Sequence, residues 1–194
     1  MERSNKVLLV ILIMFVFAFS RLIPHIPNFT PSEGIAIFGA AYLGKKYLAV
    51  ILPLFFIYIT DFIINNTVAR DYFTNTDGIV WFSNYMIFNA IALILIVLIS
   101  NKLLIKVNFK NVFLSALTAS FLFFIVSNFG VLFSSTSIYS KDISGLLQCY
   151  VAGLPFFRNS LLSTLFFTSI IFSSYYIITA LYYSKSKQTS AIND

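Results

Sequence analysis

The chain has 194 residues, of which 59% are hydrophobic and 10% are charged, and its mean hydropathy is +0.88. Soluble domains carry about a quarter charged residues, so this composition excludes an ordinary globular protein. The formal net charge of +6 comes from basic residues that stand singly or in one Lys45-Lys46 pair, which excludes a nucleic-acid-binding patch. The single cysteine, Cys149, excludes an intramolecular disulfide and any CxxC metal motif.

Apolar stretches near the spanning length of about 20 residues recur along the chain. They predict an all-α integral membrane protein, a single transmembrane domain over 1–194 that forms a bundle of six helices. The predicted helices cover about 7–23, 33–43, 47–65, 79–100, 111–130 and 160–183. The second, "EGIAIFGAAYLG", is too short to cross a hydrocarbon core of about 30 Å at 1.5 Å per residue. Its small residues favour a buried position among the other helices.

The first outer connection, "RLIPHIPNFTPSEG" (21–34), holds the only histidine and three of the five prolines. Prolines keep the backbone extended and prevent a continuing helix, so His25 is presented from a stiff segment. Two interpretations stay open for His25: a side chain bonded to water or a carbonyl at the interface, or a contact to a ligand. Asn28 in the same connection is a further ligand candidate. The sequence "NFTPSEG" predicts that the second helix begins here, with Glu33 in its first turn.

Asp61 lies inside the apolar stretch "FFIYITDFII" of the third helix. A carboxylate at mid-helix is unfavourable in lipid by about 2.5–3.5 kcal/mol, so Asp61 is expected to face the bundle and to have a partner. Arg158, a lone cation where the sixth helix begins, is the expected partner. The pair would either hold the third helix to the sixth or reach into a ligand cavity, where Arg158 would meet an anionic or carbonyl group.

The connection between the fifth and sixth helices is predicted to be a long outer cap over 131–158. Within it, "ISGLLQCYVAGLPFF" predicts a short helix on or in the outer leaflet, ended by Gly153 and Pro155, that covers the cavity as a lid. Further ligand candidates are Tyr85, Asn128 and Asn159. Catalytic and phosphate-binding motifs such as GxSxG, HExxH and Gly-rich loops are absent from the sequence. We therefore expect no cofactor and no metal site.

The basic residues predict the topology. Nine of the thirteen fall on the side of the N-terminus when six crossings are assumed: Arg3, Lys6, Lys45, Lys46, Lys102, Lys106, Lys110, Lys185 and Lys187. By the positive-inside rule, we expect both termini to be cytoplasmic in a multi-pass protein of the inner (cytoplasmic) membrane. A cleaved signal peptide ending at "AFS" is the alternative interpretation of the first helix.

The stretches "RLIPHIPNFTP", "TDF" (60–62), "SNFGVLF" and "GLLQCYVAGLPFFRN" resemble a family of uncharacterised bacterial membrane proteins of about this length. The six-helix plan also resembles the S components of energy-coupling-factor vitamin transporters, most of all the solitary cobalamin-transporting type. That resemblance implies that His25, Asp61 and Arg158 surround a cobalamin-like ligand. The cysteine of that type has no counterpart here, and its Ala-xxx-Ala docking patch is absent from the first helix. Ala36 and Ala40 carry that spacing in the second.

The expected function is therefore binding and uptake of a small vitamin-like molecule through an outward-facing cavity. The expected partners are this ligand, the lipid bilayer and, because the chain has no ATP-binding motif, a coupling subunit with ATPases. An intramembrane enzyme that uses His25 and Asp61 is one alternative. A structural or assembly subunit, with Asp61 and Arg158 as an ion pair between helices, is the other.

Overall fold

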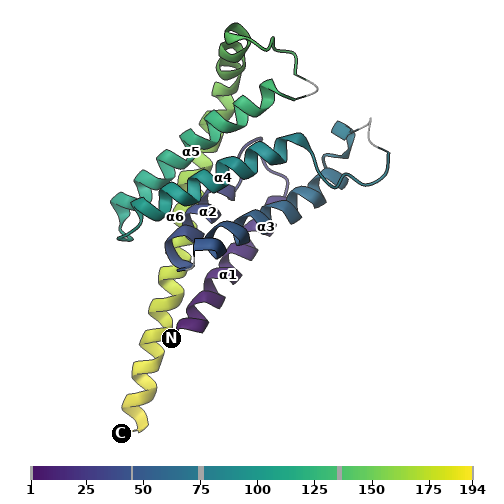
Figure 1. The fold of residues 1–194 in the computed structure, drawn as a ribbon. Helices are drawn as coiled ribbons and strands as arrows, with labels where there is room; N and C mark the ends of the chain where they lie inside the picture. Colours follow the sequence, from purple (N-terminus) through teal and green to yellow (C-terminus); the bar gives the residue numbers. More distant parts are fainter. Residues whose placement is uncertain (1, 45, 74–76, 135–136, 194) are drawn as a thin grey trace.

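The computed structural model describes residues 2–44, 46–73, 77–134 and 137–193, and over these residues the chain is helical without strands. Figure 1 shows the arrangement of the elements. In chain order they are α1 (Arg3–Phe19), η1 (Ser20–Leu22), α2 (Ser32–Tyr42), α3 (Lys46–Asn66), η2 (Arg70–Phe73), α4 (Asn84–Leu103), α5 (Phe109–Leu132) and α6 (Ile143–Asn193).

Five of the helices in the described ranges, α1, α3, α4, α5 and α6, are long and apolar enough to cross a membrane. Their length and composition identify a multi-pass membrane protein, as the sequence predicted. The N- and C-termini lie at the same end of the bundle (Figure 1). We call the opposite end, which holds residues 20–31, 67–73, 77–83, 133–134 and 137–142, the loop end.

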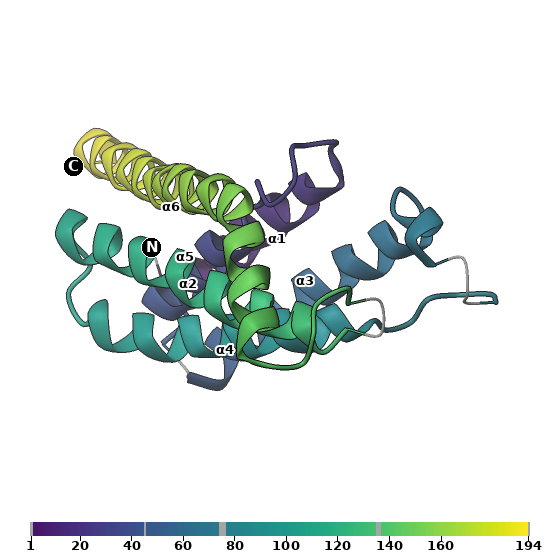
Figure 2. The ribbon, with the colours of Figure 1, turned by 90° about the horizontal axis from the view of Figure 1, so that it is seen from above.

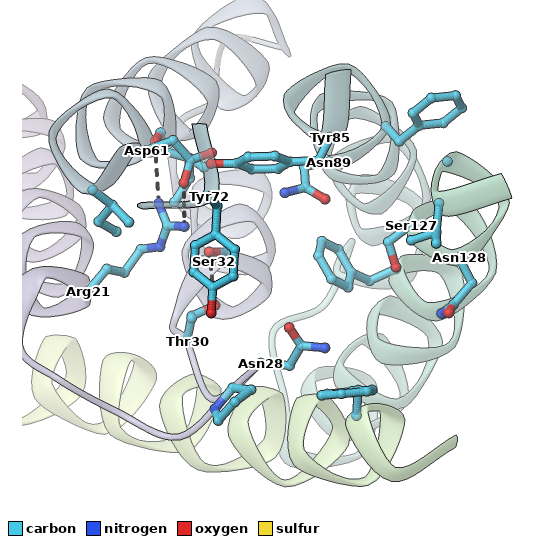
Figure 3. A pocket seen from close by; sticks show the side chains of 18 of the residues that line it. Arg21, Asn28, Thr30, Ser32, Asp61, Tyr72, Tyr85, Asn89, Ser127 and Asn128 are labelled. Carbon is cyan, nitrogen blue, oxygen red and sulfur yellow. Dashed lines mark hydrogen bonds and ion pairs between the residues drawn. The ribbon is translucent and has the colours of Figure 1, made fainter. Parts of the chain in front are cut away.

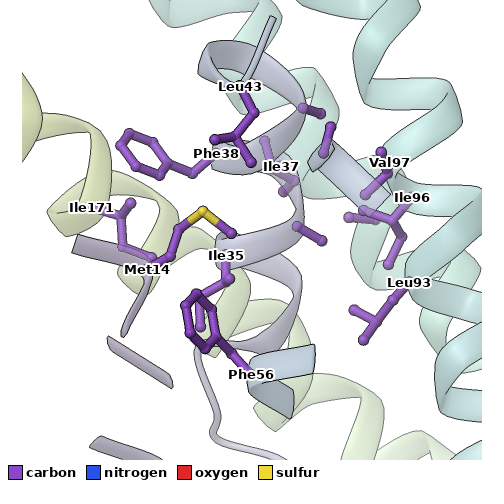
Figure 4. Packing of buried hydrophobic residues seen from close by; sticks show 14 of the residues in the cluster. Met14, Ile35, Ile37, Phe38, Leu43, Phe56, Leu93, Ile96, Val97 and Ile171 are labelled. Carbon is purple, nitrogen blue, oxygen red and sulfur yellow. The ribbon is translucent and has the colours of Figure 1, made fainter. Parts of the chain in front are cut away.

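The short helix α2 lies at the centre of the bundle and contacts all five long helices (Figure 4). Every residue from Ser32 to Ala40 is buried, because the small residues of α2 allow the neighbouring helices to approach it closely on all sides. Glycines permit the closest approaches: a Cβ on Gly34 would lie 3.2 Å from the backbone nitrogen of Thr168 in α6. The buried position expected for this segment is confirmed.

With 11 residues, α2 is about 16 Å long and does not cross a hydrocarbon core by itself. The non-helical segment 23–31 precedes it, and α6 supplies hydrogen-bond donors to that segment. The hydroxyl of Ser163 donates to the carbonyl of Thr30 at 2.6 Å, and the amide of Asn159 donates to the carbonyl of Pro27 at 3.1 Å. Irregular backbone is tolerated at membrane depth where protein satisfies its polar groups in this way.

The predicted outer cap over 131–158 is wrong in its main feature. The helix α6 begins at Ile143 and continues through Gly153 and Pro155, so within 131–158 the described non-helical residues are only 133–134 and 137–142. Pro155 removes one backbone donor and bends the helix without ending it. Figure 2 shows the first turns of α6 running in a different direction from the rest of the helix. Packing of these turns on α5 outweighs the intrinsic preference of Gly153 and Pro155 for a helix end.

Candidate functional site

A cavity of about 1100 Å³ opens at the loop end (Figure 3). Its wall combines the segment that follows η1, the second half of α3, η2, the first turns of α2, α4 and α6, and the last turns of α5. Ligand pockets in proteins measure about 300–1000 Å³, so this cavity has room for a molecule the size of a cofactor or vitamin. Segments that are far apart in the sequence thus line the same cavity.

An ion pair lies on the α3 side of the cavity, and its cation is Arg21 of η1 (Figure 3). The Nη2 atom of Arg21 is 2.6 Å from Oδ1 of Asp61, and the two side chains are 9% and 4% exposed. Nη1 of the same guanidinium donates to the hydroxyl of Thr60 and, at 3.3 Å, to the carbonyl of Ile57. The expectation that Asp61 is buried and paired is confirmed.

The expected pairing of Asp61 with Arg158 is wrong. Arg158 lies in α6 with an exposed side chain and does not line the cavity. Arg21 and Arg158 are both at the loop end, so the sequence offered two cations at a similar depth. The contact of η1 with α3 selects Arg21, and that contact follows from the way the helices pack.

Five of the predicted site residues line the cavity: His25, Asn28, Asp61, Tyr85 and Asn128. Asn159 does not, because its side-chain amide donates to the carbonyl of Pro27. Arg158 and Asn159 follow the bend of α6 at Pro155, and this part of the helix lies outside the cavity wall. The first turns of α6, in contrast, contribute Cys149 and Gly153 to the wall.

His25 and Asn28 belong to the proline-rich segment, and its local geometry decides how they are presented. The Nδ1 atom of His25 lies 2.7 Å from the carbonyl oxygen of Ile23, so Nδ1 carries the proton in this contact. Asn28 has a φ of 59°, a left-handed conformation that asparagine adopts more readily than most residues. The interpretation of His25 as a side chain bonded to a carbonyl is confirmed. His25 also lines the cavity, and its contact to a ligand stays a prediction.

On the α4 side, Tyr85 is fixed by a hydrogen bond from its hydroxyl to Oδ1 of Asn65, at 2.7 Å. Asn65 is buried in α3 and its amide also contacts the sulfur of Met86, at 3.7 Å. This connection between α3 and α4 holds the phenol ring at the cavity wall. Figure 3 shows Tyr85 close to Asp61 and Asn89.

The wall formed by α5 and the first turns of α6 is also closely packed. The thiol of Cys149 donates to the carbonyl of Asn128 at 3.3 Å, and the hydroxyl of Tyr150 donates to the carbonyl of Ile125 at 2.8 Å. At Gly153 a Cβ would collide with the side-chain amide of Asn128. Gly153 thus permits α6 to lie against α5, and Cys149 is a packed residue of this contact.

Sequence reasoning missed several lining residues, among them Tyr72, Asn89 and Ser127, and it assigned Glu33 only to the start of the second helix. Glu33 is 2% exposed and accepts a hydrogen bond from the hydroxyl of Ser160 in α6, at 3.0 Å. Its place in the first turn of α2 was visible in the sequence, but its burial depends on α6. Among the described residues, no group of three or more His, Cys, Asp or Glu side chains is arranged to hold a metal ion.

A comparison with protein-family models matches residues 1–188 to the Family of unknown function (DUF6580). The chain belongs to this family. The match covers nearly the whole chain, including every segment that lines the cavity. Neither the curated proteins nor the solved structures contain a match. Nothing in these comparisons links this DUF6580 protein to the S components of vitamin transporters.

Proposed function

We propose that this DUF6580 protein is a substrate-binding membrane protein that takes up a small molecule through the cavity at the loop end. The observation that carries the proposal is the cavity itself. It has a volume of about 1100 Å³, and its wall combines apolar surface with convergent amide, hydroxyl and charged groups. Such a combination is typical of a binding site for a small organic molecule.

The direction of uptake follows from the charges at the other end of the bundle. Lys102, Lys106 and Lys110 lie at or beside the connection between α4 and α5, at the end that also holds the termini. The positive-inside rule places that end in the cytoplasm and the cavity mouth outside. In this proposal, α2 and the segment before it make the sixth crossing.

The plan of six crossings with an outward cavity is shared with S components, and uptake would then require a coupling subunit with ATPases. Two details alter the earlier expectation. Arg158, one of three residues that the cobalamin type implied, lies outside the cavity, so we do not extend the proposal to cobalamin. Ala36 and Ala40 are 0% and 9% exposed, so they do not form a docking patch for another subunit.

The test is mass spectrometry of small molecules that co-purify with the detergent-extracted protein. Ser127→Trp would place an indole in the cavity and should abolish the bound compound. Ser169→Trp is the matched control, because Ser169 is exposed in α6 and does not line the cavity. Transport is then measured by uptake of the identified compound into proteoliposomes, with and without candidate ATPase subunits.

A compound that is present in the wild type and in Ser169→Trp but absent from folded Ser127→Trp would support a binding site in the cavity. A compound chemically changed during incubation would favour the enzyme alternative. A folded, monodisperse wild type that carries and binds nothing would contradict the proposal and favour a structural role.

A further inference from the structure

The charged residues of the cavity wall indicate which class of ligand the cavity binds. The inference from them rests on the binding function proposed above. Among the described residues, Arg21 is the only arginine or lysine that lines the cavity. Its guanidinium is neutralised by Asp61 at 2.6 Å. The other cations of the loop end, Arg70, Lys141 and Arg158, do not line the cavity. An anionic ligand would therefore meet no uncompensated positive charge.

A second carboxyl group, Glu33, lies in the same wall outside that ion pair. It is 2% exposed, and over the described part of the chain the only ion pair at or below 4.0 Å is the one between Arg21 and Asp61. The hydroxyl of Ser160 is a neutral donor to Glu33, and the guanidinium of Arg21, which Asp61 already neutralises, acts on Glu33 only from beyond 4.0 Å. A cation that enters the cavity would supply the missing positive charge.

Glu33 also occupies the N-terminus of α2, a feature of the wall that would suit an anion. The N-terminus of a helix attracts negative charge through its free N–H groups and its dipole. At the start of α2 that position is taken by the carboxyl group of Glu33 in the first turn of the helix. The protein's own acid thus replaces the anionic group that a ligand would bring.

Aromatic rings line much of the remaining wall, including Tyr72, Tyr85, Phe88, Phe123 and Phe156. Tyr72 of η2 is 87% exposed and lines the cavity, as Asn28 and Thr30 do (Figure 3). The faces of aromatic rings attract cations, most strongly where water is displaced. Aromatic rings together with an unpaired carboxyl group are a combination that recognises organic cations.

We propose that the cavity binds an organic cation, an amine or quaternary onium compound with a ring-bearing apolar body, and excludes anions. Glu33 supplies the counter-charge and Tyr72 supplies a ring face. The pair of Arg21 and Asp61 shapes the wall and adds no net charge.

The test uses three probes of related shape and different charge: tetraphenylphosphonium (cation), triphenylphosphine oxide (neutral) and tetraphenylborate (anion). Saturable binding to the full chain in lipid nanodiscs is measured after subtraction of binding to empty nanodiscs. We expect tetraphenylphosphonium to bind at least about tenfold more tightly than the neutral probe, and tetraphenylborate to show no saturable binding.

Single substitutions test whether Glu33 and Tyr72 cause the preference for the cation. Glu33→Gln removes the charge and keeps the shape, and it should weaken binding of the cation by about tenfold or more. Tyr72→Leu should weaken it by about fivefold and does not disturb the core, because Tyr72 is exposed. Tyr176→Leu, at an exposed position of α6 outside the cavity, is the matched control and should bind as the wild type does.

Equal or tighter binding of the neutral or anionic probe would overturn this inference and leave the uptake proposal intact. Unchanged cation binding in both Glu33→Gln and Tyr72→Leu would also overturn it. If none of the three probes binds, the charge of the co-purified compound decides: a cation supports the inference, and a neutral or anionic compound overturns it. If the wild type carries no compound either, both proposals fail.

Discussion

Replacing Arg21 with methionine should destabilise the folded protein by about 3–5 kcal/mol, because it leaves the buried carboxylate of Asp61 without its counter-ion. The two side chains are only 9% and 4% exposed, and their charged atoms are 2.6 Å apart. At that distance and an effective dielectric constant of about 20, the charges attract by about 6 kcal/mol, most of which offsets their removal from water.

The opposite single change should be milder. In Asp61→Leu the guanidinium of Arg21 keeps two acceptors, the hydroxyl of Thr60 and the carbonyl of Ile57. We therefore expect the free energy of unfolding to fall by about 3 kcal/mol, the lower end of the same range. In the double variant Arg21→Met/Asp61→Leu, two apolar side chains replace the pair, and the protein should be more stable than either single variant.

The assay is the free energy of unfolding from SDS titration in mixed micelles, combined as a double-mutant cycle. Arg158→Met is the control, since this exposed side chain should change stability by no more than about 0.5 kcal/mol. Two results would refute the reasoning. The first is a double variant whose decrease in the free energy of unfolding equals the sum of the two single decreases. The second is an Arg158→Met variant that is as unstable as Arg21→Met. The second would restore the pairing of Asp61 with Arg158.

Two further predictions concern the contacts of α6. Ser160→Ala removes the hydroxyl that donates to Glu33 at 3.0 Å, and it should lower the free energy of unfolding by about 1.5–3 kcal/mol, because a buried carboxylate loses a donor. A loss below the error of the same SDS titration would show that this bond is absent. Gly153→Ala should lower the free energy of unfolding by about 1–3 kcal/mol, because the new Cβ collides with the amide of Asn128. Shortening that amide in Gly153→Ala/Asn128→Ala should recover part of the loss in thermal stability, and the absence of any recovery would contradict the packing of α6 on α5.

Much of the fold could be predicted from local properties of the chain. Apolar runs of spanning length identify the long helices, because the bilayer requires them whatever their neighbours are. The small residues of α2 predicted its burial, since they permit close contact between helices. The continuity of α6 could not be predicted in the same way. Gly153 and Pro155 favour a helix end locally, and only the packing of the first turns of α6 on α5 outweighs that preference.

The candidate site, too, could be predicted from the sequence only in part. That Asp61 must be buried and paired follows from the sequence alone, because an isolated carboxylate in an apolar span is too unfavourable. Which cation pairs with it does not follow, since Arg21 and Arg158 both lie at the loop end. Among the described elements, η1, which carries Arg21, contacts α3, and α6, which carries Arg158, does not. Which elements become neighbours of α3 depends on how all the side chains of the bundle pack together, and only the tertiary structure decides that.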